Sequence, residues 1–429
     1  MSDRYFHSEE MLKRALKTIP LGTQTFSKSK TQYPHGVSPY YVHKGLGGHI
    51  WDVDGNEYVD FINGLASITL GYNDPDVRNA VLAQLDYGTI FSLPHPLEVE
   101  VSEKFVEIVP CAEMVRFGKN GSDATSGAVR LARAYTGRDH IAVCGYHGWQ
   151  DWYIGSTPRN KGVPKLTQQL THSFNYNDIE SLHKLFSERV DQFAAVIMEP
   201  MNVAEPKNGF LEEVKELTHK NNALLVFDEM VTGFRFSKGG AQELFGVTPD
   251  LGTFGKGMAN GFPISAVGGR ADVMKLMEEI FFSFTFGGET LSLAAAGATM
   301  KKLQSQPVTE ILMRQGTKII DGVVQLIKKY DLTDVLSIAG HPSWSFLIIK
   351  ETANYNTWQI KTLFLQEVFA RGILTFGTHN LSYSHTDEDI NYLLSVYDQV
   401  LPILKDAISN KRLDLYLKCQ TLEPLFKLR

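Results

Sequence analysis

The spacing of hydrophobic and polar residues first predicts an N-terminal arm. Over 9–18, apolar residues recur every three or four positions, as on one face of a helix, and Ser8 stands where a helix cap belongs. Residues 23–39 are polar, aromatic and irregular. A loop of that length without structure of its own usually has a function or covers another part of the protein.

Strict alternation follows in two short runs. Residues 49–53 and 57–61 alternate on either side of an Asp-Gly-Asn sequence, which predicts a β-hairpin. Asp52, Asp54 and Asn56 also resemble part of a calcium-binding loop. The glycine stands at the wrong offset and the closing glutamate is absent, so we expect a plain turn and no metal site.

From about residue 75 to 300, apolar runs without alternation are separated by stretches with helical spacing. Such runs are typical of strands buried on both faces, so the pattern predicts a mostly parallel sheet covered by helices. We expect strands at 140–144, 194–198, 222–227 and 251–254, and helices at 123–135 and 209–221. After about residue 300 we expect longer helices around a few strands, at 308–330, 357–371 and 387–404.

These patterns predict an α/β protein with a large domain on a mostly parallel sheet and a second, smaller α+β domain. We place the N-terminal arm and part of the small domain in 1–70, the large domain in 71–300, and the C-terminal small domain in 301–429. Residues 411–429 mix Leu, Tyr and Phe with basic residues, and we expect them to pack on a neighbouring subunit or to hang free.

Composition excludes several classes of protein. The 429 residues carry a net charge of −6, which argues against a broad nucleic-acid surface. No apolar run approaches the roughly 18 residues of a membrane span, and the first residues lack the basic and apolar regions of a signal peptide. The three cysteines are scattered, which excludes a disulfide scaffold or a Cys-rich zinc site and indicates a reducing cytoplasm.

Two candidate chemical groups follow expected strands. Asp228 and Glu229 come after the apolar run 224–227, and ligands of open α/β sheets bind at that end of the strands. An acidic pair also suits the start of an ordinary loop. Lys256 stands between two glycines, where its amine has room to approach a ligand, although a surface turn would look the same. The motif is neither a Walker loop nor a dinucleotide fingerprint.

Two further motifs suit a flat, phosphorylated ligand. Gly121 and Ser122 precede the expected helix at 123–135, and the free N–H groups of a helix N-terminus bind anions. Any well-capped helix has the same pattern. Tyr146 and His147 follow the expected strand 140–144, where a planar ring either stacks on a flat cofactor or packs in the core.

Together these four features indicate pyridoxal 5′-phosphate. A lysine amine forms a Schiff base with a carbonyl, and a carboxylate keeps a pyridine nitrogen protonated. A helix N-terminus takes the phosphate, and an aromatic side chain stacks on the ring. The combination predicts a cofactor bound covalently to Lys256, with Asp228 supporting its use as an electron sink.

The chain resembles the class III (ω-type) pyridoxal-phosphate aminotransferases, and within them glutamate-1-semialdehyde 2,1-aminomutase and its transaminase relatives. The resemblance covers nearly the whole chain, from residue 51 to 389. The motifs that carry it stand at 120–125, 146–148, 199–200, 228–235, 255–257 and 285–288.

The resemblance implies a fold-type I PLP-dependent transferase, in which 71–300 is the PLP-binding domain and two subunits share their active sites. It implies Lys256 and Asp228 as the catalytic residues. Tyr146 and Met230 would lie against the two faces of the cofactor ring. The full set of cofactor-binding residues that it implies is Gly121, Ser122, Tyr146, His147, Glu199, Asp228, Met230, Lys256 and, reaching in from the other subunit, Thr285.

The sequence departs from the family where substrate would be recognised. Glu289 and Thr290 stand where members usually have Asn-Pro. Gly377, eight residues before His385, takes the place of an aminomutase glutamate. Residues 22–28 also differ from the aminomutase stretch. We therefore expect the cofactor chemistry to be retained and the substrate to be altered.

We interpret the chain as a PLP-dependent aminotransferase (transaminase) that moves an amino group from a small-molecule donor to an aldehyde or ketone by a ping-pong Schiff-base mechanism. The intramolecular aminomutase is the alternative, and a catalytically silent regulatory or structural relative is a third hypothesis. We expect neither nucleic acid nor membrane as a partner. Substrate would contact 23–30, 149–159 and 377–380; the candidates for polar contacts, each also plausible as a structural residue, are Tyr153, Arg159, His379 and Asn380.

Overall fold

The computed structural model describes residues 3–423, and the chain within it divides into two units. The small unit holds the described residues up to Leu65, then Leu70–Asp74, then those from Glu310 onward. The large unit holds Ala66–Thr69 and Pro75–Thr309. The division expected from the sequence lies after residues 70 and 300. No helix in the described part of the chain is long and apolar enough to cross a membrane.

The large unit is built on a seven-stranded sheet in the order β4-β10-β9-β8-β7-β5-β6. Neighbours from β9 to β6 pair in parallel, while β10 runs antiparallel to both β9 and β4. The carboxyl ends of all the strands except β10 therefore lie at one edge of the sheet. The strands are β4 (Met114–Gly118), β5 (His140–Cys144), β6 (Thr171–Ser173), β7 (Phe193–Met198), β8 (Leu224–Asp228), β9 (Leu251–Phe254) and β10 (Ser265–Gly269).

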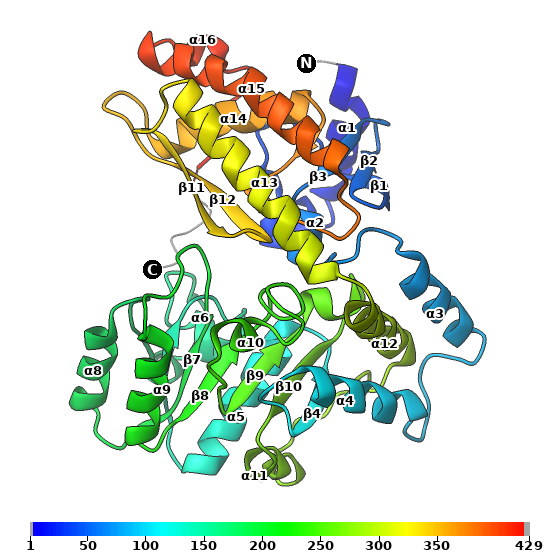
Figure 1. Ribbon diagram of the computed structural model, residues 1–429, viewed down its shortest axis with the longest axis vertical. Coiled ribbons are helices and arrows are strands. Elements are labelled where there is room, and N and C mark those ends of the chain that lie inside the picture. Colours follow the sequence, from blue (N-terminus) through cyan, green and yellow to red (C-terminus); the bar gives the residue numbers. More distant parts are fainter. Residues whose placement is uncertain (1–2, 424–429) are drawn as a thin grey trace. The chain divides into compact units, whose positions relative to one another are not determined.

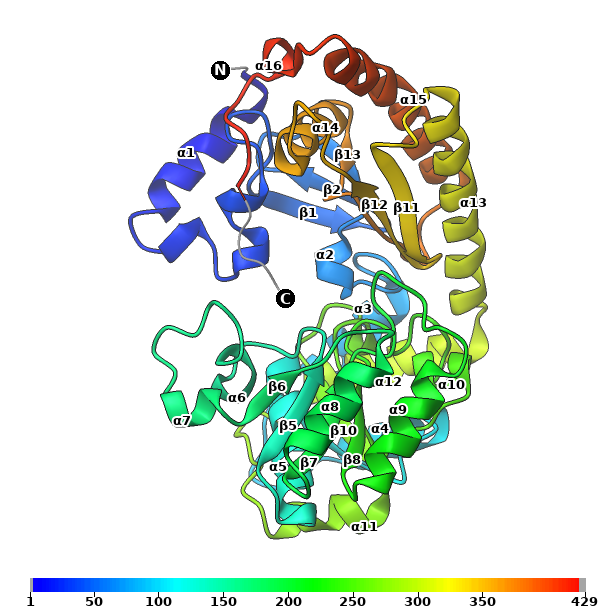
Figure 2. The ribbon, with the colours of Figure 1, turned by 90° about the vertical axis from the view of Figure 1, so that its left-hand side faces the viewer.

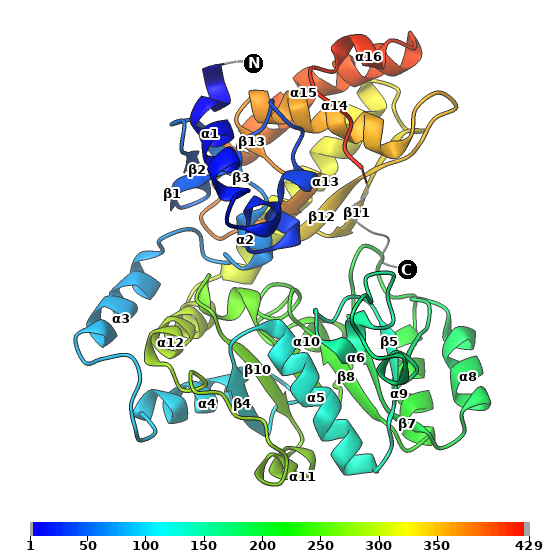
Figure 3. The same ribbon diagram turned by 180° about the vertical axis from the view of Figure 1, so that it is seen from behind.

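Helices cover both faces of this sheet, as the unbroken apolar runs predict. Successive strand residues turn to opposite sides, so that Val226 packs with α5 (Gly121–Thr136) while Phe227 packs with α8 (Ile179–Glu188) and α9 (Phe210–Lys220). Figure 1 shows α8 and α9 in front of the sheet, and Figure 3 shows α5 on the opposite face. The expected α/β fold is confirmed, and the elements expected between 123 and 254 are present with ends that differ by at most two residues.

The other helices of the large unit flank the sheet or carry its loops. They are α3 (Pro75–Leu85), α4 (Pro96–Ile108), α6 (Asp151–Ile154), α7 (Lys165–Gln168), α10 (Ala241–Phe245), α11 (Ala271–Met274) and α12 (Thr290–Ser305), with 3-10 turns η5 (Lys256–Ala259) and η6 (Lys275–Glu278).

The small unit contains two smaller sheets. One has the order β1-β2-β3-β13 and the other β11-β12-β14. The expected hairpin is β2 and β3, and β3 also pairs in parallel with β13, Val59 lying opposite Ile373. The strands are β1 (Val42–Leu46), β2 (His49–Asp52), β3 (Glu57–Asp60), β11 (Leu336–His341), β12 (Trp344–Ile349), β13 (Ile373–Leu374) and β14 (Thr378–Asn380).

Long helices complete the small unit. Figure 2 shows α13 and α15 side by side, and an ion pair of 2.6 Å between Lys329 and Asp398 joins them. The helices are α1 (Phe6–Ala15), α2 (Asn63–Ala66), α13 (Val308–Lys329, which begins in the large unit), α14 (Thr357–Ala370), α15 (Asp387–Ser409) and α16 (Leu413–Tyr416). Short 3-10 turns occupy Asp3–Tyr5, Pro20–Gly22, Phe26–Lys28 and Lys30–Gln32.

The prediction that Ser8 caps the first helix is wrong. The helix α1 begins at Phe6, and the carboxylate of Asp54 in the hairpin turn accepts the N–H groups of His7 at 2.6 Å and Ser8 at 2.9 Å. A distant carboxylate thus does what the sequence assigned to a local hydroxyl. Asp52 accepts the N–H groups of Asp54 and Asn56, which supports the plain turn.

The segment after α15 packs on its own unit. Gln366 of α14 accepts the N–H group of Lys418 at 2.8 Å, and Thr362 accepts that of Leu422 at 2.9 Å. These contacts contradict the expectation that the segment hangs free, because they attach its described part to α14 of the same chain. The remainder of the expected segment, 424–429, lies outside the described residues.

Two glycines within helices test how α13 and α12 pack against their neighbours. A Cβ atom on Gly316 of α13 would collide with the backbone carbonyl of Pro342, which cannot move aside as a side chain can. On Gly297 of α12 it would lie 3.4 Å from Val101, an ordinary contact. We expect Gly316→Ala to lower the free energy of unfolding by about 1–3 kcal/mol. Gly297→Ala should be neutral or stabilising by up to about 1 kcal/mol. Chemical denaturation measures both, and equal effects would contradict the packing described.

Candidate active site

The candidate residues converge because their strands are parallel. Asp228 ends β8, and Glu199 follows β7. The turn with Lys256 follows β9, and that with Tyr146 follows β5. Gly121 begins α5, three residues after the end of β4. All five segments therefore leave the same edge of the sheet, where ligands of open α/β sheets bind.

Asp228 is buried and paired with a buried histidine. Its Oδ2 lies 2.7 Å from Nδ1 of His147, and its Oδ1 accepts the N–H group of Met230 at 3.1 Å. The ring of His147 is held in turn by Tyr153, edge-on at 5.2 Å. Within the described chain, Nε2 of His147 is buried without a hydrogen-bond partner. The pair holds a carboxylate in a set orientation at the end of the central strand.

The neighbouring carboxylate has a structural role. Glu229 accepts the N–H groups of Ala241 at 2.7 Å and Gln242 at 2.8 Å, at the start of α10. Burial raises the pKa of Glu229, and these hydrogen bonds oppose the shift. The acidic pair seen in the sequence is thus one carboxylate paired with His147 and one helix cap.

Lys256 has a strained backbone and an accessible side chain. Its φ of 42° lies in the left-handed region, which costs a residue with a side chain of the order of 1 kcal/mol. The side chain is exposed to solvent, yet the surrounding protein desolvates the amine and lowers its pKa from 10.5. Glu199 and Asp228 oppose this shift by their charges, and Arg235 adds to it. The amine is therefore within electrostatic reach of both carboxylates.

Two glycines make room for Met230. A Cβ atom on either Gly121 or Gly255 would lie 2.8 Å from its Sδ atom, closer than such contacts occur. Met230 is therefore in close contact with both the start of α5 and the lysine turn. These glycines bring the expected phosphate-binding segment and the expected covalent anchor to a single side chain.

The N-terminus of α5 is fixed by its neighbours. Oγ of Ser122 accepts the N–H group of Trp149 at 3.2 Å, and a Cβ on Gly148 would strike the same hydroxyl. Asp123 accepts the N–H group of Asn120 at 2.7 Å. The first N–H groups of a helix have no intrahelical acceptor, so those of Gly121 and Ser122 suit an anion.

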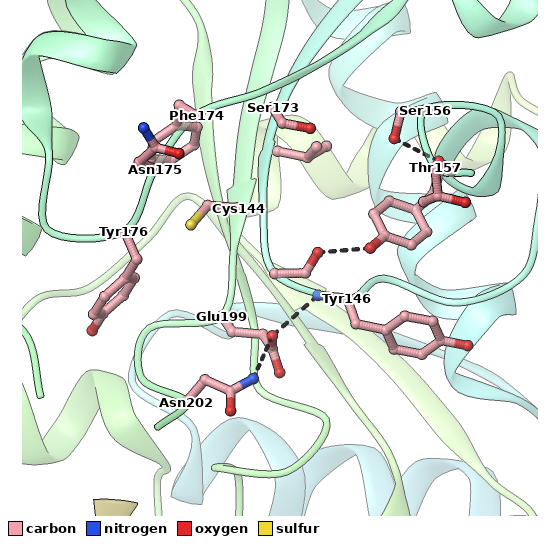
Figure 4. Close-up of a pocket in the computed structure, with 13 residues that line it drawn as sticks. Cys144, Tyr146, Ser156, Thr157, Ser173, Phe174, Asn175, Tyr176, Glu199 and Asn202 are labelled. Atoms are coloured by element: carbon pink, nitrogen blue, oxygen red, sulfur yellow. Dashed lines mark hydrogen bonds between the residues drawn. The ribbon is translucent and has the colours of Figure 1, made fainter. Parts of the chain in front are cut away.

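Tyr146 and Glu199 are joined through the backbone. Oε2 of Glu199 accepts the N–H group of Tyr146 at 3.1 Å and the amide of Asn202 at 2.9 Å (Figure 4). The Tyr146 ring is exposed and meets the ring of Tyr153 edge-on at 5.7 Å. Burial, and then the charge of Asp228, raise the pKa of Glu199.

Thr285 stands apart from this cluster. It is exposed in the segment before α12, and the contacts described above do not include it. Glu289 of the same segment caps α12 and lies 3.0 Å from Lys119. Desolvation alone would raise the pKa of Glu289, but bonds from Ser292, Lys119 and the N–H of Leu291 give a net lowering. Glu289 is thus held as a helix cap.

The polar candidates for substrate contact are mostly occupied. Nδ1 of His379 lies 2.9 Å from Ser345 Oγ and Nε2 lies 2.9 Å from Tyr397 OH, so the small unit uses both nitrogens. Burial lowers the pKa of His379 to about 3. Asn380 donates to the carbonyl of Ile62 at 2.7 Å. We therefore assign His379 and Asn380 to the packing of the small unit.

The other two candidates lie in the large unit. The hydroxyl of Tyr153 donates to the carbonyl of Gly145 at 2.7 Å, so this residue supports the turn that carries Tyr146. Arg159 is exposed, and its N–H group donates to Thr157 Oγ1 at 3.1 Å. A structural role therefore fits Tyr153 best.

Sequence reasoning gave no role to Arg235 or Thr69. Arg235 is fully buried, and desolvation lowers its pKa to about 10. Its Nη2 lies 3.5 Å from Thr69 Oγ1, and a Cβ on Gly257 would strike the same hydroxyl. Thr69 thus packs on the lysine turn. No pattern in the sequence joins a threonine at 69 to a turn at 257, although Arg235 stands in the quoted motif.

Comparison with known proteins gives the family. The family "Aminotransferase class-III" matches residues 32–386. The 3-aminobutyryl-CoA aminotransferase of Cloacimonas acidaminovorans (strain Evry) is 34% identical over 411 residues, 94% of this chain and 98% of that protein. A glutamate-1-semialdehyde 2,1-aminomutase of Persephonella marina (strain DSM 14350 / EX-H1) is 34% identical over 388 residues, 84% and 90% of the two chains.

Solved structures agree. The internal aldimine form of the FumI protein from Sphingopyxis sp. MTA144 has a TM-score of 0.88 and 28% identity over 96% of this chain and all of that one. An omega-transaminase from Sphaerobacter thermophilus has a TM-score of 0.84 and 27% identity, over 93% and 98% of the two chains. The chain belongs to the class-III aminotransferases, enzymes that use pyridoxal 5′-phosphate to transfer amino groups.

Proposed function

We propose that Lys256 and Asp228 are the catalytic residues of an intermolecular aminotransferase, which works on a separate amino donor and carbonyl acceptor. The observation that carries this proposal is the accessible amine of Lys256, within electrostatic reach of the buried Asp228–His147 pair. Strained backbone of this kind clusters at functional sites, and Lys256 has a φ of 42°.

The residues present fit pyridoxal 5′-phosphate. Lys256 offers an amine to its aldehyde, and Asp228 a carboxylate to its ring nitrogen. Gly121 and Ser122 offer N–H groups to its phosphate. Tyr146 offers an exposed ring for stacking, and the thioether of Met230 is kept clear by two glycines. When bound, the cofactor supplies a sink for the electrons released as a C–H bond beside the amine breaks.

The amine of Lys256 moves the proton. Its lowered pKa leaves more of it neutral near pH 7 than an exposed lysine would have, and only the neutral amine accepts a proton or attacks a carbonyl. The carboxylates of Glu199 and Asp228 limit this lowering, because they favour the charged form. Asp228 in turn is held by His147, which would keep its carboxylate oriented for the ring nitrogen of a bound cofactor.

Two observations favour intermolecular transfer over the aminomutase reaction. Gly377, where the aminomutase has a glutamate, has φ +85° and accepts the N–H of Leu347 at 2.7 Å through its carbonyl, so a side chain there would be strained. Glu289, the other carboxylate that could face a second amine, is held by Lys119 and by the start of α12.

We also propose a homodimer, in which Thr285 reaches the phosphate site of the other subunit. An apolar surface runs over the end of α3 and the start of α4. The hydroxyl of Thr290 donates to the carbonyl of Gly88 at 2.9 Å, which places the segment of Thr285 beside it. Phe286, exposed over 56% of its surface, continues the patch. Its other members are Leu82, Leu85, Tyr87, Ile90, Phe91, Leu93 and Val99.

A patch of this kind is typical of an interface between proteins.

For the cellular location we propose the cytoplasm. All three cysteines are free thiols, and two of them are buried without a partner cysteine, which suits a reducing compartment.

The donor requirement tests the reaction. We expect the holoenzyme to consume a separate amino donor and to release a keto co-product, and Lys256→Ala to abolish both while the fold is retained. Lys275→Ala, an exposed lysine of the same unit, is the control. Chromatography of the co-product decides. Conversion of glutamate-1-semialdehyde to 5-aminolevulinate without any donor, at kcat/KM above ~10⁴ M⁻¹s⁻¹, would establish the aminomutase instead.

The acidic pair at the end of β8 can be separated by substitution. Asp228→Asn should lower the rate about 10³-fold, equivalent to about 4 kcal/mol, because an amide does not keep the ring nitrogen protonated. Glu229→Gln should instead lower the free energy of unfolding by about 1–3 kcal/mol, since the cap of α10 is weakened. Single-turnover kinetics and chemical denaturation, applied to both variants, would refute the division of roles if the effects were reversed.

The apolar surface predicts the oligomeric state. Phe286→Asp should shift the protein from dimer to monomer and remove activity, because a buried charge opposes association and Thr285 is withdrawn. Leu415→Asp, which alters an exposed leucine of α16, should leave the dimer intact. Sedimentation velocity with a parallel activity assay measures this, and an active monomeric wild type would overturn the proposal.

A further inference from the structure

A pocket of about 480 Å³ opens beside Tyr146, at the carboxyl ends of β5, β6 and β7. Figure 4 shows Glu199 and Asn202 at one end of it and Ser173 and Asn175 at the other. Its volume is in the range of small-molecule sites. We call it the Glu199 pocket. Tyr146 and Glu199 of the expected cofactor-binding set line it, whereas Lys256, Asp228 and Ser122 do not, so the pocket adjoins the expected cofactor site.

The lining has an unusual balance of charge. Among the 13 residues that form it, Glu199 is the one charged side chain, and no lysine, arginine or histidine is present. Its other polar groups are the hydroxyls of Ser156, Thr157 and Ser173, the phenols, and the amides of Asn175 and Asn202. A carboxylate or phosphate placed here would meet a like charge without a counterion.

The Glu199 carboxylate can accept a hydrogen bond from a ligand. Both hydrogen bonds that the structure gives it, from Tyr146 and Asn202, fall on Oε2. Within the described chain Oε1 accepts none. Two nearby hydroxyls are directed elsewhere: that of Tyr153 donates to the carbonyl of Gly145 and that of Tyr176 to the carbonyl of Pro200. A ligand group that donates a hydrogen bond would therefore find a ready acceptor.

The pocket adjoins the proposed reaction site. Tyr146 belongs to both, and the charge of Glu199 acts on the amine of Lys256. A substrate that reacts beside Lys256 can thus extend past Tyr146 toward Glu199. Because the end that enters the pocket meets one anion and several neutral polar groups, its chemistry is constrained even though the reacting end is common to all aminotransferase substrates.

We propose that the Glu199 pocket receives the far end of the amino donor, and that this end carries an ammonium or hydroxyl group rather than a carboxylate. The preferred donors are accordingly diamines and amino alcohols. The inference rests on the proposed function, since it assigns the substrate class of that same site. It goes beyond it, because aminotransferases in general act on many amino acids.

A series of donors with equal chain length tests the proposal on the holoenzyme. Putrescine, aminobutanol, butylamine and γ-aminobutyrate share one reacting end and differ only at the other. We expect kcat/KM for putrescine and aminobutanol to exceed that for butylamine by about tenfold or more, the value of one charge-assisted hydrogen bond. γ-Aminobutyrate should be the poorest donor of the four.

A variant that adds a positive charge to the pocket, compared with one that adds the same charge elsewhere, gives a second test. Ser173 is exposed at the end of β6, so Ser173→Lys can fold; Ser187→Lys, on the outer face of α8, adds the same charge outside the pocket. Ser173→Lys should lower kcat/KM for putrescine about tenfold and raise that for γ-aminobutyrate, whereas Ser187→Lys should change neither. Calorimetric titration of the apoprotein with putrescine should show the same loss of binding without any turnover.

The outcomes separate the two proposals. If γ-aminobutyrate reacts as well as putrescine, or if the enzyme uses other amino acids but none of these four donors, the assignment of the Glu199 pocket is wrong and the aminotransferase stands. Equal effects of Ser173→Lys and Ser187→Lys would also overturn it. If no amine of any kind yields a keto co-product, the proposed function itself fails.

Discussion

Parallel hydrogen bonding between neighbouring strands is the constraint on which the active site depends. In the pairing of β8 with β9, Asp228 lies opposite Thr253, so the turn with Lys256 must begin just beyond the carboxylate. In the pairing of β5 with β7, Cys144 lies opposite Met198, which brings Tyr146 and Glu199 to adjacent positions. Backbone hydrogen bonds between the strands thus bring residues that are far apart in sequence to the same edge of the sheet.

Much of this could be predicted from the sequence, because the signals are local. The apolar runs of β5, β7, β8 and β9 have no alternation between apolar and polar residues. Each is followed by a charged or aromatic residue unusual enough to suggest a site, such as Lys256 between glycines. The short strand β6, the antiparallel strand β10 and its neighbour β4 gave no comparable signal. Ser265–Gly269 contains two glycines, and Thr171–Ser173 is too short for a periodicity to emerge.

Other features could not be predicted, because they depend on contacts between distant segments. The cap of α1 comes from Asp54, not from Ser8, and only the folded hairpin brings that carboxylate into place. Glu229 looks equivalent to Asp228 in the sequence, yet one faces His147 and the other the start of α10. His379 was a candidate for substrate contact, but its two nitrogens are used by partners on β12 and α15.

The pairing of β3 with β13 has a consequence for the nascent chain. During synthesis, the strand of Val59 gains this neighbour only after Ile373, more than three hundred residues later, has been made. While the ribosome makes the intervening residues, the outer edge of the β2–β3 hairpin has no native partner, and exposed strand edges are where foreign strands add. Synthesis of the last quarter of the chain is therefore what closes the small unit, and a stalled or truncated product would keep that edge open.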